Sequence, residues 1–598
     1  MEVVLLDVPR CLVSPEFDKQ KGAQEEDVYA STAFCRLQES ILLHYTHTHI
    51  RFLFFNTLGC QCHCVSTLPT TFRFLAENNL KPSGREYELR SAMEPSENRG
   101  IEDGLVHKIP TLSEVMEELK ELSSIGMPVT AMNFVVYLRA MVSVLCMGRL
   151  GSLELAGGAL AIGFTNITGY SVLFGLASGM DPVCGQAYGS KNWSLIGLSL
   201  HRTILMLLSA SVPISLMWIN LKSIMLRLRQ DPGITEVASV YCFFAVPDLL
   251  ANSILQPLRV YLRSQGITRP MMWCSFLAVL FHVPLSLLLV FVLDMGVPGV
   301  AIATWCTNFN MVVFLVAYLI YTGVHKRTYV QWSVACLKEW CPLLKLALPS
   351  CFAVCLEWWW YEIMTLLAGY LHNPKVTVAT AAIVIQTTSL MYTVPMALGS
   401  SVSTRVGNEL GAGKPSRAKL ATLVAIGCGM FIALVSVTWT TFLRYLWGQV
   451  FTNDAGVLAL TASVLPIIGL CELGNCPQTT GCGVLRGSAR PAIGARINLW
   501  SFYFIGMPVA IVLAFFFKLG LLGLCYGLLA AQIACAFSIL FVVLRTDWSF
   551  EALKAKELTG GNCELELSNS DEELGLLTDT DGEKELQATF GTINKDSS

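Results

Sequence analysis

Twelve long apolar stretches, separated by short polar connections, dominate the chain between Leu122 and Arg545. They occupy residues 122–148, 157–181, 196–221, 236–256, 268–293, 297–322, 343–371, 378–403, 418–445, 457–480, 490–517 and 520–545. Each is close to the ~20 apolar residues that carry a helix across a bilayer. The pattern therefore predicts an all-α polytopic membrane protein with twelve transmembrane helices.

The segments outside these stretches are polar and lack a helical period. Residues 1–110 mix charged, polar and aromatic residues, so we expect a poorly ordered cytosolic extension there. Thr111 and Glu114 then form a capping box, which predicts a helix start. We expect the functional protein to begin near Met93, with the residues before it dispensable. Residues 546–598 are acidic and predict a disordered cytosolic tail.

Composition agrees with a membrane protein and excludes other classes. Of the 598 residues, 53% are hydrophobic and 14% are charged, and the mean hydropathy is +0.54. The net charge of −3 gives no reason to expect nucleic-acid binding. The cysteine-rich tract at residues 60–64 lacks a second cluster of ligands that would complete a zinc site. We therefore predict no metal and no cofactor.

The connections between the apolar stretches carry basic residues unevenly. Fifteen Lys and Arg lie in the even-numbered connections and seven in the odd-numbered ones. Since basic loops tend to stay in the cytosol, the even connections and both termini are predicted to be cytosolic. The basic cluster at residues 222–229 on the predicted outer side runs against this trend. The expected location is the plasma membrane or an endomembrane (Golgi, late endosome or vacuole).

The chain also contains an internal repeat with a spacing of about 222 residues. The loop Gly185–Lys191 recurs as Gly407–Gly413, and Leu262–Pro270 recurs as Leu485–Pro491. Each copy has six spans, an even number, so both copies insert with the same orientation. A duplicated bundle with a cavity between its halves is the architecture of an alternating-access carrier.

The repeat predicts two pseudo-symmetric six-helix lobes. We place the N-terminal lobe at residues 111–322 and the C-terminal lobe at residues 343–545. A cytosolic linker at residues 323–342 is expected to join them.

One stretch places a carboxylate and aromatic side chains at mid-membrane depth. Glu357 lies at the midpoint of its apolar run and is followed by Trp358, Trp359 and Trp360. A carboxylate at that depth costs on the order of 2.5 kcal/mol or more on insertion scales, which favours a functional role. Tryptophans more often lie at the two membrane–water interfaces. The combination predicts an ion-coupled site for an aromatic or cationic solute.

Four strings identify a family resemblance. CLEWWWYEIM, SSVSTRVGNELGAGKP, GMDPVCGQAYGSKN and GVLRGSARP resemble the multidrug and toxic compound extrusion (MATE) transporters of plants, the DETOXIFICATION group. The resemblance covers roughly residues 109–545. It implies a twelve-helix, two-lobe antiporter that exports organic solutes in exchange for protons or sodium, usually protons in plants.

The resemblance also implies a pair of coupling residues in the C-terminal lobe. A seventh-helix Glu and a tenth-helix Asp are held to couple protons in plant relatives. Glu357 matches the first, whereas Asn475 stands where the second is expected. Glu472 lies about one turn earlier and is a candidate replacement, so Glu357, Glu472 and Asn475 form the predicted proton-coupling set. For Glu472 and Asn475 the alternative is a purely structural link between helices.

Further polar and aromatic residues are candidates for the solute cavity. They are Trp358, Trp359, Tyr361, Glu362 and Gln386. Successive helical residues turn by 100°, so only one or two of the tryptophans can face one cavity. For Gln386 an interhelical hydrogen bond is the alternative role. For Glu357 the alternative is a carboxyl that only cross-links neighbouring helices.

The N-terminal lobe has a counterpart of this set. Asp248 precedes Asn252 by about one turn, and the pair corresponds in position to Glu472 and Asn475. Two roles are open for Asp248: a second cation site, or a salt bridge to Arg139 in the first span.

We therefore predict a secondary active antiporter, not an enzyme, that exports xenobiotics, secondary metabolites or hormones. Its expected partners are a small organic solute, protons and the lipid bilayer, and it is expected to act as a monomer. A proton gradient supplies the energy, with sodium as the alternative ion. The rival functions are a lipid or lipid-linked sugar flippase and an uncoupled channel or membrane scaffold. Few cations at cavity depth count against the flippase, and the acidic, aromatic site counts against the channel.

Overall fold

The structure is a computed structural model that describes residues 110–228, 230–331 and 340–560. Among these residues, twelve helical spans are long and apolar enough to cross a membrane, which confirms the predicted number. The expected N-terminal extension, the start of the functional protein near Met93 and the cysteine-rich tract at 60–64 lie outside the described residues.

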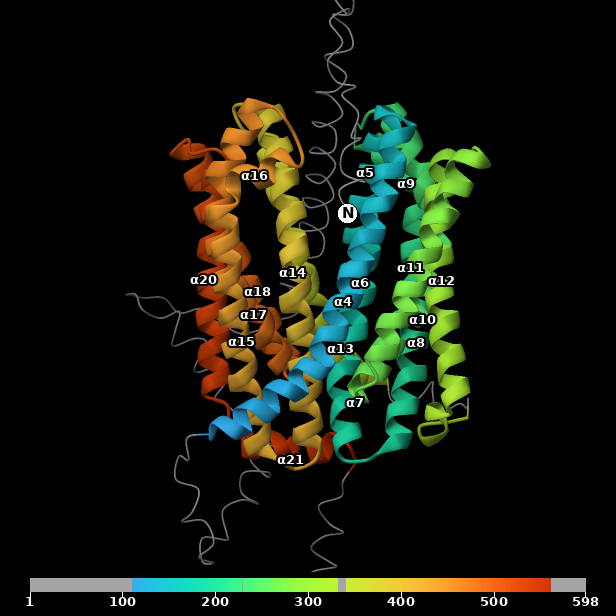
Figure 1. Cartoon of the computed structure of the whole chain (residues 1–598), viewed down its shortest axis with the longest axis vertical. Coiled ribbons are helices and arrows are strands. Elements are labelled where there is room, and N and C mark those ends of the chain that lie inside the picture. The colour runs from blue at the N-terminus through green and yellow to red at the C-terminus, as the bar shows by residue number, and fades with distance from the viewer. Residues whose placement is uncertain (1–109, 229, 332–339, 561–598) are drawn as a thin grey trace, which may run out of the picture. The chain divides into compact units, whose positions relative to one another are not determined.

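The first six spans form one bundle, coloured blue to yellow-green in Figure 1. They are α4 (Leu112–Leu150); the succession of α5 (Ser152–Thr165), the π-helical turn η1 (Asn166–Tyr170), α6 (Ser171–Ser178) and α7 (Met180–Gly189); α8 (Trp193–Ile219); α10 (Pro232–Ser264); α11 (Arg269–Leu287) with η2 (Leu288–Val292); and α12 (Gly296–Thr322). The short helices α9 (Leu221–Arg227) and η3 (Val324–Arg327) lie in connections.

The last six spans form the second bundle, coloured yellow to red. They are α13 (Trp340–Ala368); α14 (Pro374–Gly411); α15 (Pro415–Phe442); α17 (Ala455–Gly487); the succession of α18 (Pro491–Asn498), η5 (Leu499–Gly506), α19 (Met507–Ile511) and η6 (Val512–Phe516); and α20 (Leu521–Leu544). The short α16 (Arg444–Gln449) precedes α17, and α21 (Trp548–Leu558) follows the last span.

Local sequence signals start the helices where they were expected. At the start of α4 the backbone N–H of Thr111 donates to Glu114 Oε2 at 2.8 Å, and the N–H of Glu114 donates to Thr111 Oγ1 at 3.4 Å. This is the predicted capping box. Asp231 and Asp454 cap α10 and α17 by accepting hydrogen bonds from the backbone at the start of each helix.

Side-chain contacts repeat between the lobes as the sequence repeat predicts. The indole N–H of Trp218 donates to Thr168 Oγ1 at 2.9 Å in the first lobe. In the second lobe Trp447 donates to Thr387 Oγ1, also at 2.9 Å. Trp218 lies in α8 and Trp447 in α16, and each bonds the second span of its own lobe. The two lobes therefore share local packing as well as topology.

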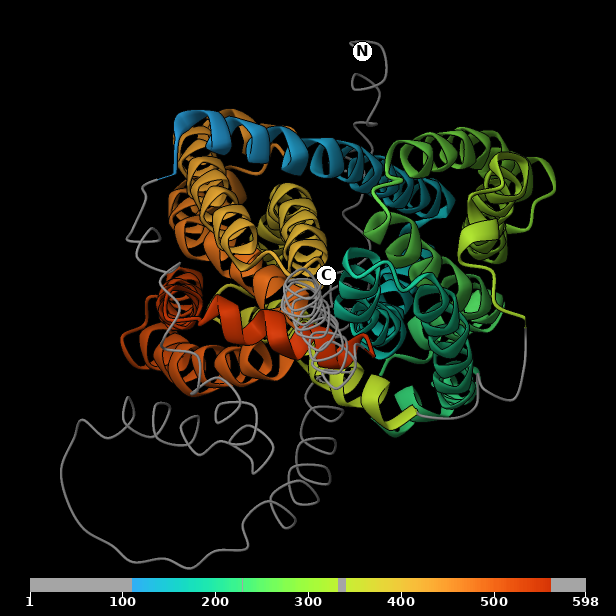
Figure 2. The ribbon, with the colours of Figure 1, turned by 90° about the horizontal axis from the view of Figure 1, so that it is seen from below.

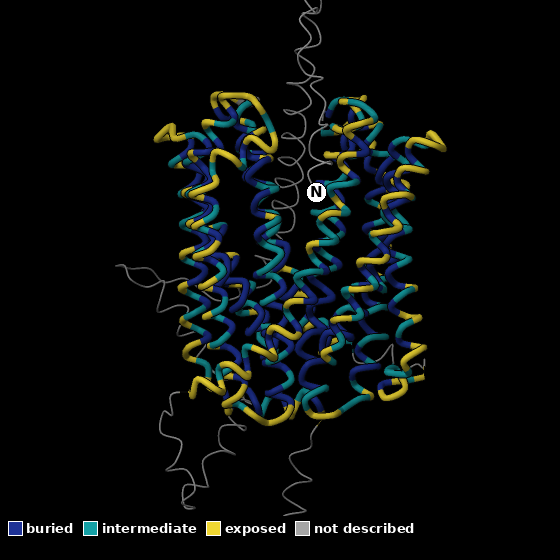
Figure 3. The backbone as a smooth tube through the Cα atoms, viewed as in Figure 1, coloured by how far each residue is buried: buried dark blue, intermediate teal, exposed yellow. Residues whose placement is uncertain are grey.

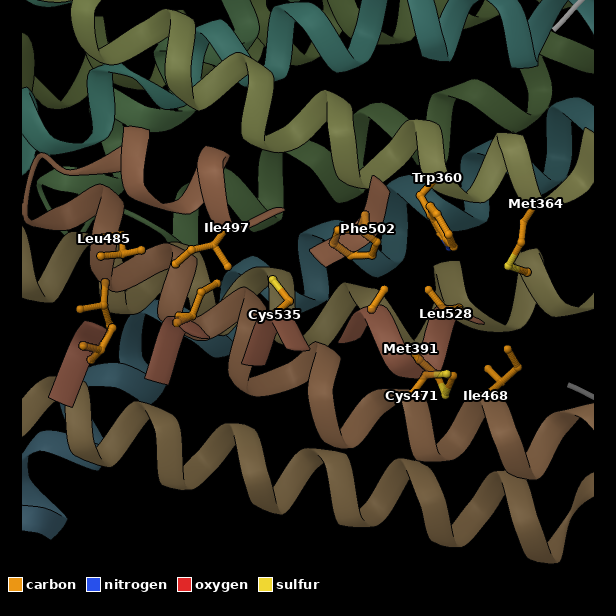
Figure 4. Packing of buried hydrophobic residues seen from close by; sticks show 14 of the residues in the cluster. Trp360, Met364, Met391, Ile468, Cys471, Leu485, Ile497, Phe502, Leu528 and Cys535 are labelled. Carbon is orange, nitrogen blue, oxygen red and sulfur yellow. The ribbon is translucent and has the colours of Figure 1, made fainter. Parts of the chain in front are cut away.

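Each lobe has its own hydrophobic core, and its outer helices expose apolar side chains. In the C-terminal lobe Trp360 and Phe502 pack together at a ring-centroid distance of 5.8 Å (Figure 4). On the outside, Phe431 is 68% exposed and Phe537 is 72% exposed. Exposed positions run along the outer helices of both lobes in Figure 3. Such exposed faces fit contact with lipid rather than water.

The first helix of each lobe packs against the other lobe, and Figure 2 shows α4 running alongside the second lobe. From α4, Glu118 forms a bidentate ion pair with Arg405 of α14 at 2.8 and 2.9 Å. In the reciprocal contact, the indole N–H of Trp359 on α13 donates to the carbonyl of Ile167 at 3.3 Å. The crossing brings the middle of α13 next to the N-terminal lobe.

The lobes also touch where α7 and α14 end, and glycines make this contact possible. A Cβ added to Gly411 would lie 2.0 Å from the carbonyl oxygen of Gln186, and one added to Gly189 would lie 2.1 Å from that of Asn408. Gly185 and Gly407 also face each other, and a Cβ added to Gly185 would lie 3.3 Å from Gly407 Cα. The segments predicted as loops around Gly185 and Gly407 are therefore the last turns of α7 and α14, and they form a contact between the lobes.

The start of the acidic tail differs from the prediction, because residues Trp548–Leu558 form α21. Asp547 caps this helix by accepting from the N–H groups of Ser549 and Phe550, both at 3.1 Å. Within this segment Trp548, Ala552 and Ala555 are buried and, at spacings of four and three residues, form one apolar face of the helix. Just after α21, the carbonyl of Thr559 accepts a hydrogen bond from Asn192 of the N-terminal lobe at 2.9 Å. Residues 561–598 of the tail lie outside the described residues.

Candidate functional site

Glu357 lies inside the C-terminal lobe, at the middle of α13, and only 7% of the residue is exposed. Its Oε2 accepts a hydrogen bond from Gln478 Nε2 of α17 at 3.3 Å. Within the described part of the chain it forms no ion pair. A buried carboxyl held by a neutral amide can gain or lose a proton without breaking a salt bridge.

A small cavity of about 30 Å³ lies beside Glu357, with room for roughly one or two waters. Its polar lining includes Tyr392 of α14, Arg486 of α17 and Asn498 of α18. Phe174 of α6 adds an aromatic wall from the other lobe. The cavity therefore joins the Glu357 carboxyl to one cationic side chain and several neutral polar groups.

Glu472 and Asn475 form a second buried polar group on α17, and each is 1% exposed. Asn475 Nδ2 donates to both carboxylate oxygens of Glu472, at 3.0 and 3.2 Å. Asn475 Oδ1 in turn accepts hydrogen bonds from Thr479 at 3.4 Å and from Gln532 of α20 at 3.5 Å. The amide thus holds the carboxylate of Glu472 directly.

This contact leads to a prediction about moving the acid along α17. In the single variant Glu472→Asn we expect gradient-driven transport to fall by about 5- to 150-fold, the range of typical coupling free energies. In the double variant Glu472→Asn, Asn475→Asp the same two groups exchange places one turn apart. Because the carboxylate and amide still face each other, we expect most of the coupling to return. The measurement is solute uptake into reconstituted vesicles with an imposed pH gradient.

Two results would contradict the coupling role of Glu472. One is full gradient-driven uptake by the single variant. The other is a double variant as inactive as the single one although it is folded and inserted to the same extent. Asn475→Ala serves as the matched control, since it removes the amide but keeps the acid.

The three adjacent tryptophans face different surroundings, as their 100° spacing requires. Trp358 stacks on Phe174 of α6, with a centroid distance of 5.9 Å and an interplanar angle of 17°. Trp359 is bonded to the backbone of Ile167 in the other lobe, as described above. Trp360 is buried in the core of the C-terminal lobe. Trp358 and Trp359 therefore lie at the contact between the lobes.

The remaining cavity candidates also lie in helix contacts. Tyr361 packs against the hydrophobic core of the C-terminal lobe, and Glu362 is half-buried. Gln386 Oε1 accepts a hydrogen bond from the hydroxyl of Tyr137 on α4 at 3.2 Å, which is the interhelical role considered for it. Among the described residues, the lining of the cavity beside Glu357 includes none of the five predicted cavity residues, which are Trp358, Trp359, Tyr361, Glu362 and Gln386.

Asp248 in the N-terminal lobe is held by neutral donors. Its carboxylate accepts hydrogen bonds from Tyr170 at 2.7 Å, from Asn308 at 2.6 Å and from Asn252 at 3.1 Å. Arg139 donates to Asn308 Oδ1 at 2.6 Å and forms no direct ion pair with Asp248 in the described part of the chain. The salt bridge considered from the sequence is thus replaced by a bridge through Asn308.

Three residues of the site escaped the sequence reasoning: Gln478, Tyr392 and Arg486. Gln478 sits six residues after Glu472 in the same buried helix, so its position at mid-depth was a usable signal. Tyr392 and Arg486 approach Glu357 only through the packing of α14 and α17 on α13. No group of three or more His, Cys, Asp and Glu that could hold a metal ion occurs among the described residues.

Comparisons with known proteins agree with the overall fold. A family model described as MatE matches residues 128–288 and 349–512, one segment in each lobe. Protein DETOXIFICATION 55 of Arabidopsis thaliana is 58% identical over 474 residues, which cover 77% of this chain and 94% of that protein. Protein DETOXIFICATION 48 of the same plant is 52% identical over 464 residues, which cover 78% and 87%.

A solved structure is similar over the same region. The crystal structure of the eukaryotic MATE transporter AtDTX14 matches with a TM-score of 0.72 at 31% sequence identity. The match covers 75% of this chain and 100% of that chain.

Proposed function

The chain belongs to the MATE family of membrane transporters, in the plant DETOXIFICATION group, and on this premise we propose that it exports organic solutes in exchange for protons. Membership makes it a multi-pass integral membrane transporter of small solutes with ion coupling, and not an enzyme. The identity of the ion and the direction of transport are the new parts of the proposal.

The observation that carries the proposal is the buried Glu357, bonded to Gln478 at 3.3 Å and without an ion pair in the described residues. A charged carboxylate in low-dielectric surroundings is costly, so its protonation state responds to what else binds nearby. A proton and a cationic or aromatic solute then compete for the same region. Competition of this kind is what exchange transport requires.

Alternating access follows from the contact between the lobes. The glycine contact between α7 and α14 must open for solute to pass that end of the protein. A proton can drive this change only if it binds the two states with different affinity. The crossing of α13 supports such a link, because this helix contacts both lobes. Its Trp359 bonds Ile167 of the N-terminal lobe, and its Glu357 bonds Gln478 of α17.

The other acids take different roles in this mechanism. Glu472 is a second coupling group, which stands one turn from the family position now occupied by Asn475. Asp248 with Asn252 is a structural anchor, because three neutral donors already bind its carboxylate. Trp358 and Trp359 offer aromatic surface at the lobe contact on the solute path.

The loop charges support an orientation with both termini in the cytosol, and hence export away from it. We propose a monomer in the plasma membrane or an endomembrane. A flippase would need a broad basic cavity for lipid headgroups, whereas Arg486 is the only basic side chain that lines the cavity beside Glu357 in the described residues.

The test is solute uptake into inside-out or reconstituted vesicles with and without an imposed pH gradient. The probes are ethidium, a rhodamine dye and quercetin, and a protonophore collapses the gradient in the control. Gradient-driven, protonophore-sensitive uptake supports proton antiport. Uptake that follows a sodium gradient instead would make sodium the coupled ion. Uptake that is indifferent to both gradients would favour the flippase or the channel.

A further inference from the structure

Arg486, in the last turn of α17, lines the same cavity as Glu357. Its Nε is buried without a hydrogen-bond partner, and no ion pair joins its guanidinium to another described residue. A buried N–H group without a hydrogen-bond partner is costly, so the position of this arginine beside the cavity calls for a physical reason.

The N-terminal lobe shows what the equivalent arginine does there. Arg263 corresponds to Arg486 in the repeat, and its Nη2 lies 2.5 Å from Asp181 Oδ1 in a buried ion pair. The position of Asp181 in the second copy, 222 residues later, is Ser403. The Ser403 hydroxyl is buried without a hydrogen-bond partner. The C-terminal lobe therefore has the arginine but no acid at the position that matches Asp181.

The helices α14 and α17 pack closely at Ser403, which places this residue next to the end of α17. A Cβ added to Gly487, next to Arg486, would lie 2.5 Å from the backbone carbonyl oxygen of Ser403. An acid at position 403 would therefore lie beside Arg486, as Asp181 lies beside Arg263.

The carboxyl of Glu357, in turn, has no counterpart in the N-terminal lobe. The residue 222 positions before Glu357 is Val135, so the N-terminal lobe has no carboxyl at that place. In the N-terminal lobe the arginine is paired with Asp181, whereas in the C-terminal lobe it shares a cavity with Glu357.

Helix direction brings the two side chains toward each other. Successive spans alternate in direction, so α13 and α17, the seventh and tenth spans, run antiparallel. Helical side chains lean toward the N-terminus of their own helix, so Glu357 and Arg486 lean toward one another. Gln478, which bonds Glu357, precedes Arg486 by eight residues or about 12 Å of helix, a distance that the long arginine side chain reduces.

We propose that Arg486 is a positioning residue for coupling: its unpaired guanidinium provides the counter-charge that allows Glu357 to release its proton. The inference rests on the proposed proton antiport and adds one residue to it. When Glu357 is ionised, the two charges in the cavity cancel. When Glu357 is protonated, the cavity carries the single positive charge of Arg486, which disfavours a cationic solute and so separates proton binding from solute binding.

Other titratable groups near Glu357 do not replace this role. They are Glu472 and Cys482 of α17, Tyr361 of α13, Tyr392 of α14 and Tyr503 of η5. None of these carries a positive charge in any protonation state. Arg486 is the cation whose field reaches Glu357.

The experiment measures solute–solute exchange at equal pH on both sides of the membrane, over a range of pH. The probe is whichever of ethidium, rhodamine and quercetin the wild type exchanges fastest. Because solute binds when Glu357 is ionised, the rate rises with pH as the proton leaves. In Arg486→Gln we expect the midpoint of this rise to move to higher pH by about one unit or more. Arg486→Lys keeps the charge and is expected to restore most of the wild-type profile.

A second variant tests the same idea with the arginine in place. Ser403→Asp rebuilds the ion pair of the N-terminal lobe and so withdraws Arg486 from Glu357. We expect an alkaline shift like that of Arg486→Gln. Ser403→Ala is the matched control, and it should keep the wild-type profile.

An unchanged profile in both Arg486→Gln and Ser403→Asp overturns the proposal, as does a shift in Arg486→Gln that lysine fails to reverse. These outcomes differ from failure of the proposed function. If wild-type uptake ignores a pH gradient, antiport itself is wrong. If the wild type is gradient-driven and Glu357→Gln abolishes that drive while the Arg486 and Ser403 variants keep the normal profile, only the role of Arg486 is wrong.

Discussion

Replacement of Glu357 by glutamine is expected to abolish solute uptake driven by a pH gradient. Glutamine has the same shape and still bonds Gln478, but it cannot bind and release a proton. The expected loss is roughly 100-fold, toward the upper end of coupling free energies between sites. Exchange of labelled for unlabelled solute without a gradient should fall to the low rate of the protonated wild type and lose its dependence on pH, because glutamine is neutral at every pH. The two assays are run on the same vesicles.

The comparison variant is Asp248→Asn in the N-terminal lobe. Asp248 is equally buried, but it is bound by Tyr170, Asn252 and Asn308. We expect this variant to lose stability, by about 1–3 kcal/mol for donors left without an acceptor, while its remaining uptake still follows the gradient. The reverse pattern, with coupling lost in Asp248→Asn and kept in Glu357→Gln, would move the coupling site to the N-terminal lobe.

Replacement of Gly411 by alanine is expected to prevent the lobes from closing where α7 and α14 meet. The new Cβ would lie 2.0 Å from the backbone carbonyl oxygen of Gln186, and backbone atoms cannot turn aside as the end of a side chain can. Overpacking of this kind costs about 1–3 kcal/mol, which shifts a two-state population by roughly 5- to 150-fold. Since each transport cycle passes through the closed contact, we expect the transport rate to fall by a similar factor.

The control is Gly427→Ala in α15, because a Cβ at Gly427 meets nothing within 4 Å. Labels attached through cysteines at the exposed Ser190 and Lys414 report the separation of the two loops. Gly411→Ala should lengthen that distance and slow transport, whereas Gly427→Ala should change neither. Wild-type transport and separation in Gly411→Ala would mean that the α7–α14 contact is not part of the cycle.

Hydropathy and the repeat were sufficient to predict the twelve spans and the two lobes. These features depend on composition averaged over about 20 residues, and a lipid environment imposes that average strongly. Glu357 could be singled out for a similar reason, since only Glu357 and Glu362 are acidic within the apolar run 343–371. The capping box at Thr111 and Glu114 depends on contacts three residues apart, so it too was visible in the sequence.

Contacts between distant helices were beyond the sequence pattern. The crossing of α4 to Arg405 and of α13 to Ile167 depends on how whole helices tilt, which periodicity does not encode. The helix α21 was missed because the tail as a whole is acidic, whereas this segment has two Glu and two Lys and buries Trp548, Ala552 and Ala555 on one face. The salt bridge to Arg139, one of two roles considered for Asp248, is absent because Asn308 lies between the two side chains in the described structure.

The asymmetry between the lobes gives the repeat a functional meaning. The arginine at the end of α10 has its acid on α7, whereas the arginine at the end of α17 shares a cavity with Glu357 and has Ser403 at the repeat position of that acid. In the mechanism that we propose, the C-terminal lobe would respond to the proton, and the N-terminal lobe would provide the surface against which it moves.

The most direct test of proton antiport records solute uptake and internal pH together in reconstituted vesicles. With no gradient imposed at the start, inward movement of solute through the wild type should drive protons out of the vesicle in a fixed ratio. In the Glu357→Gln protein, any solute movement that remains should carry no protons. Solute uptake by the wild type with no proton movement, or an unchanged proton flux in Glu357→Gln, would contradict coupling through this carboxyl.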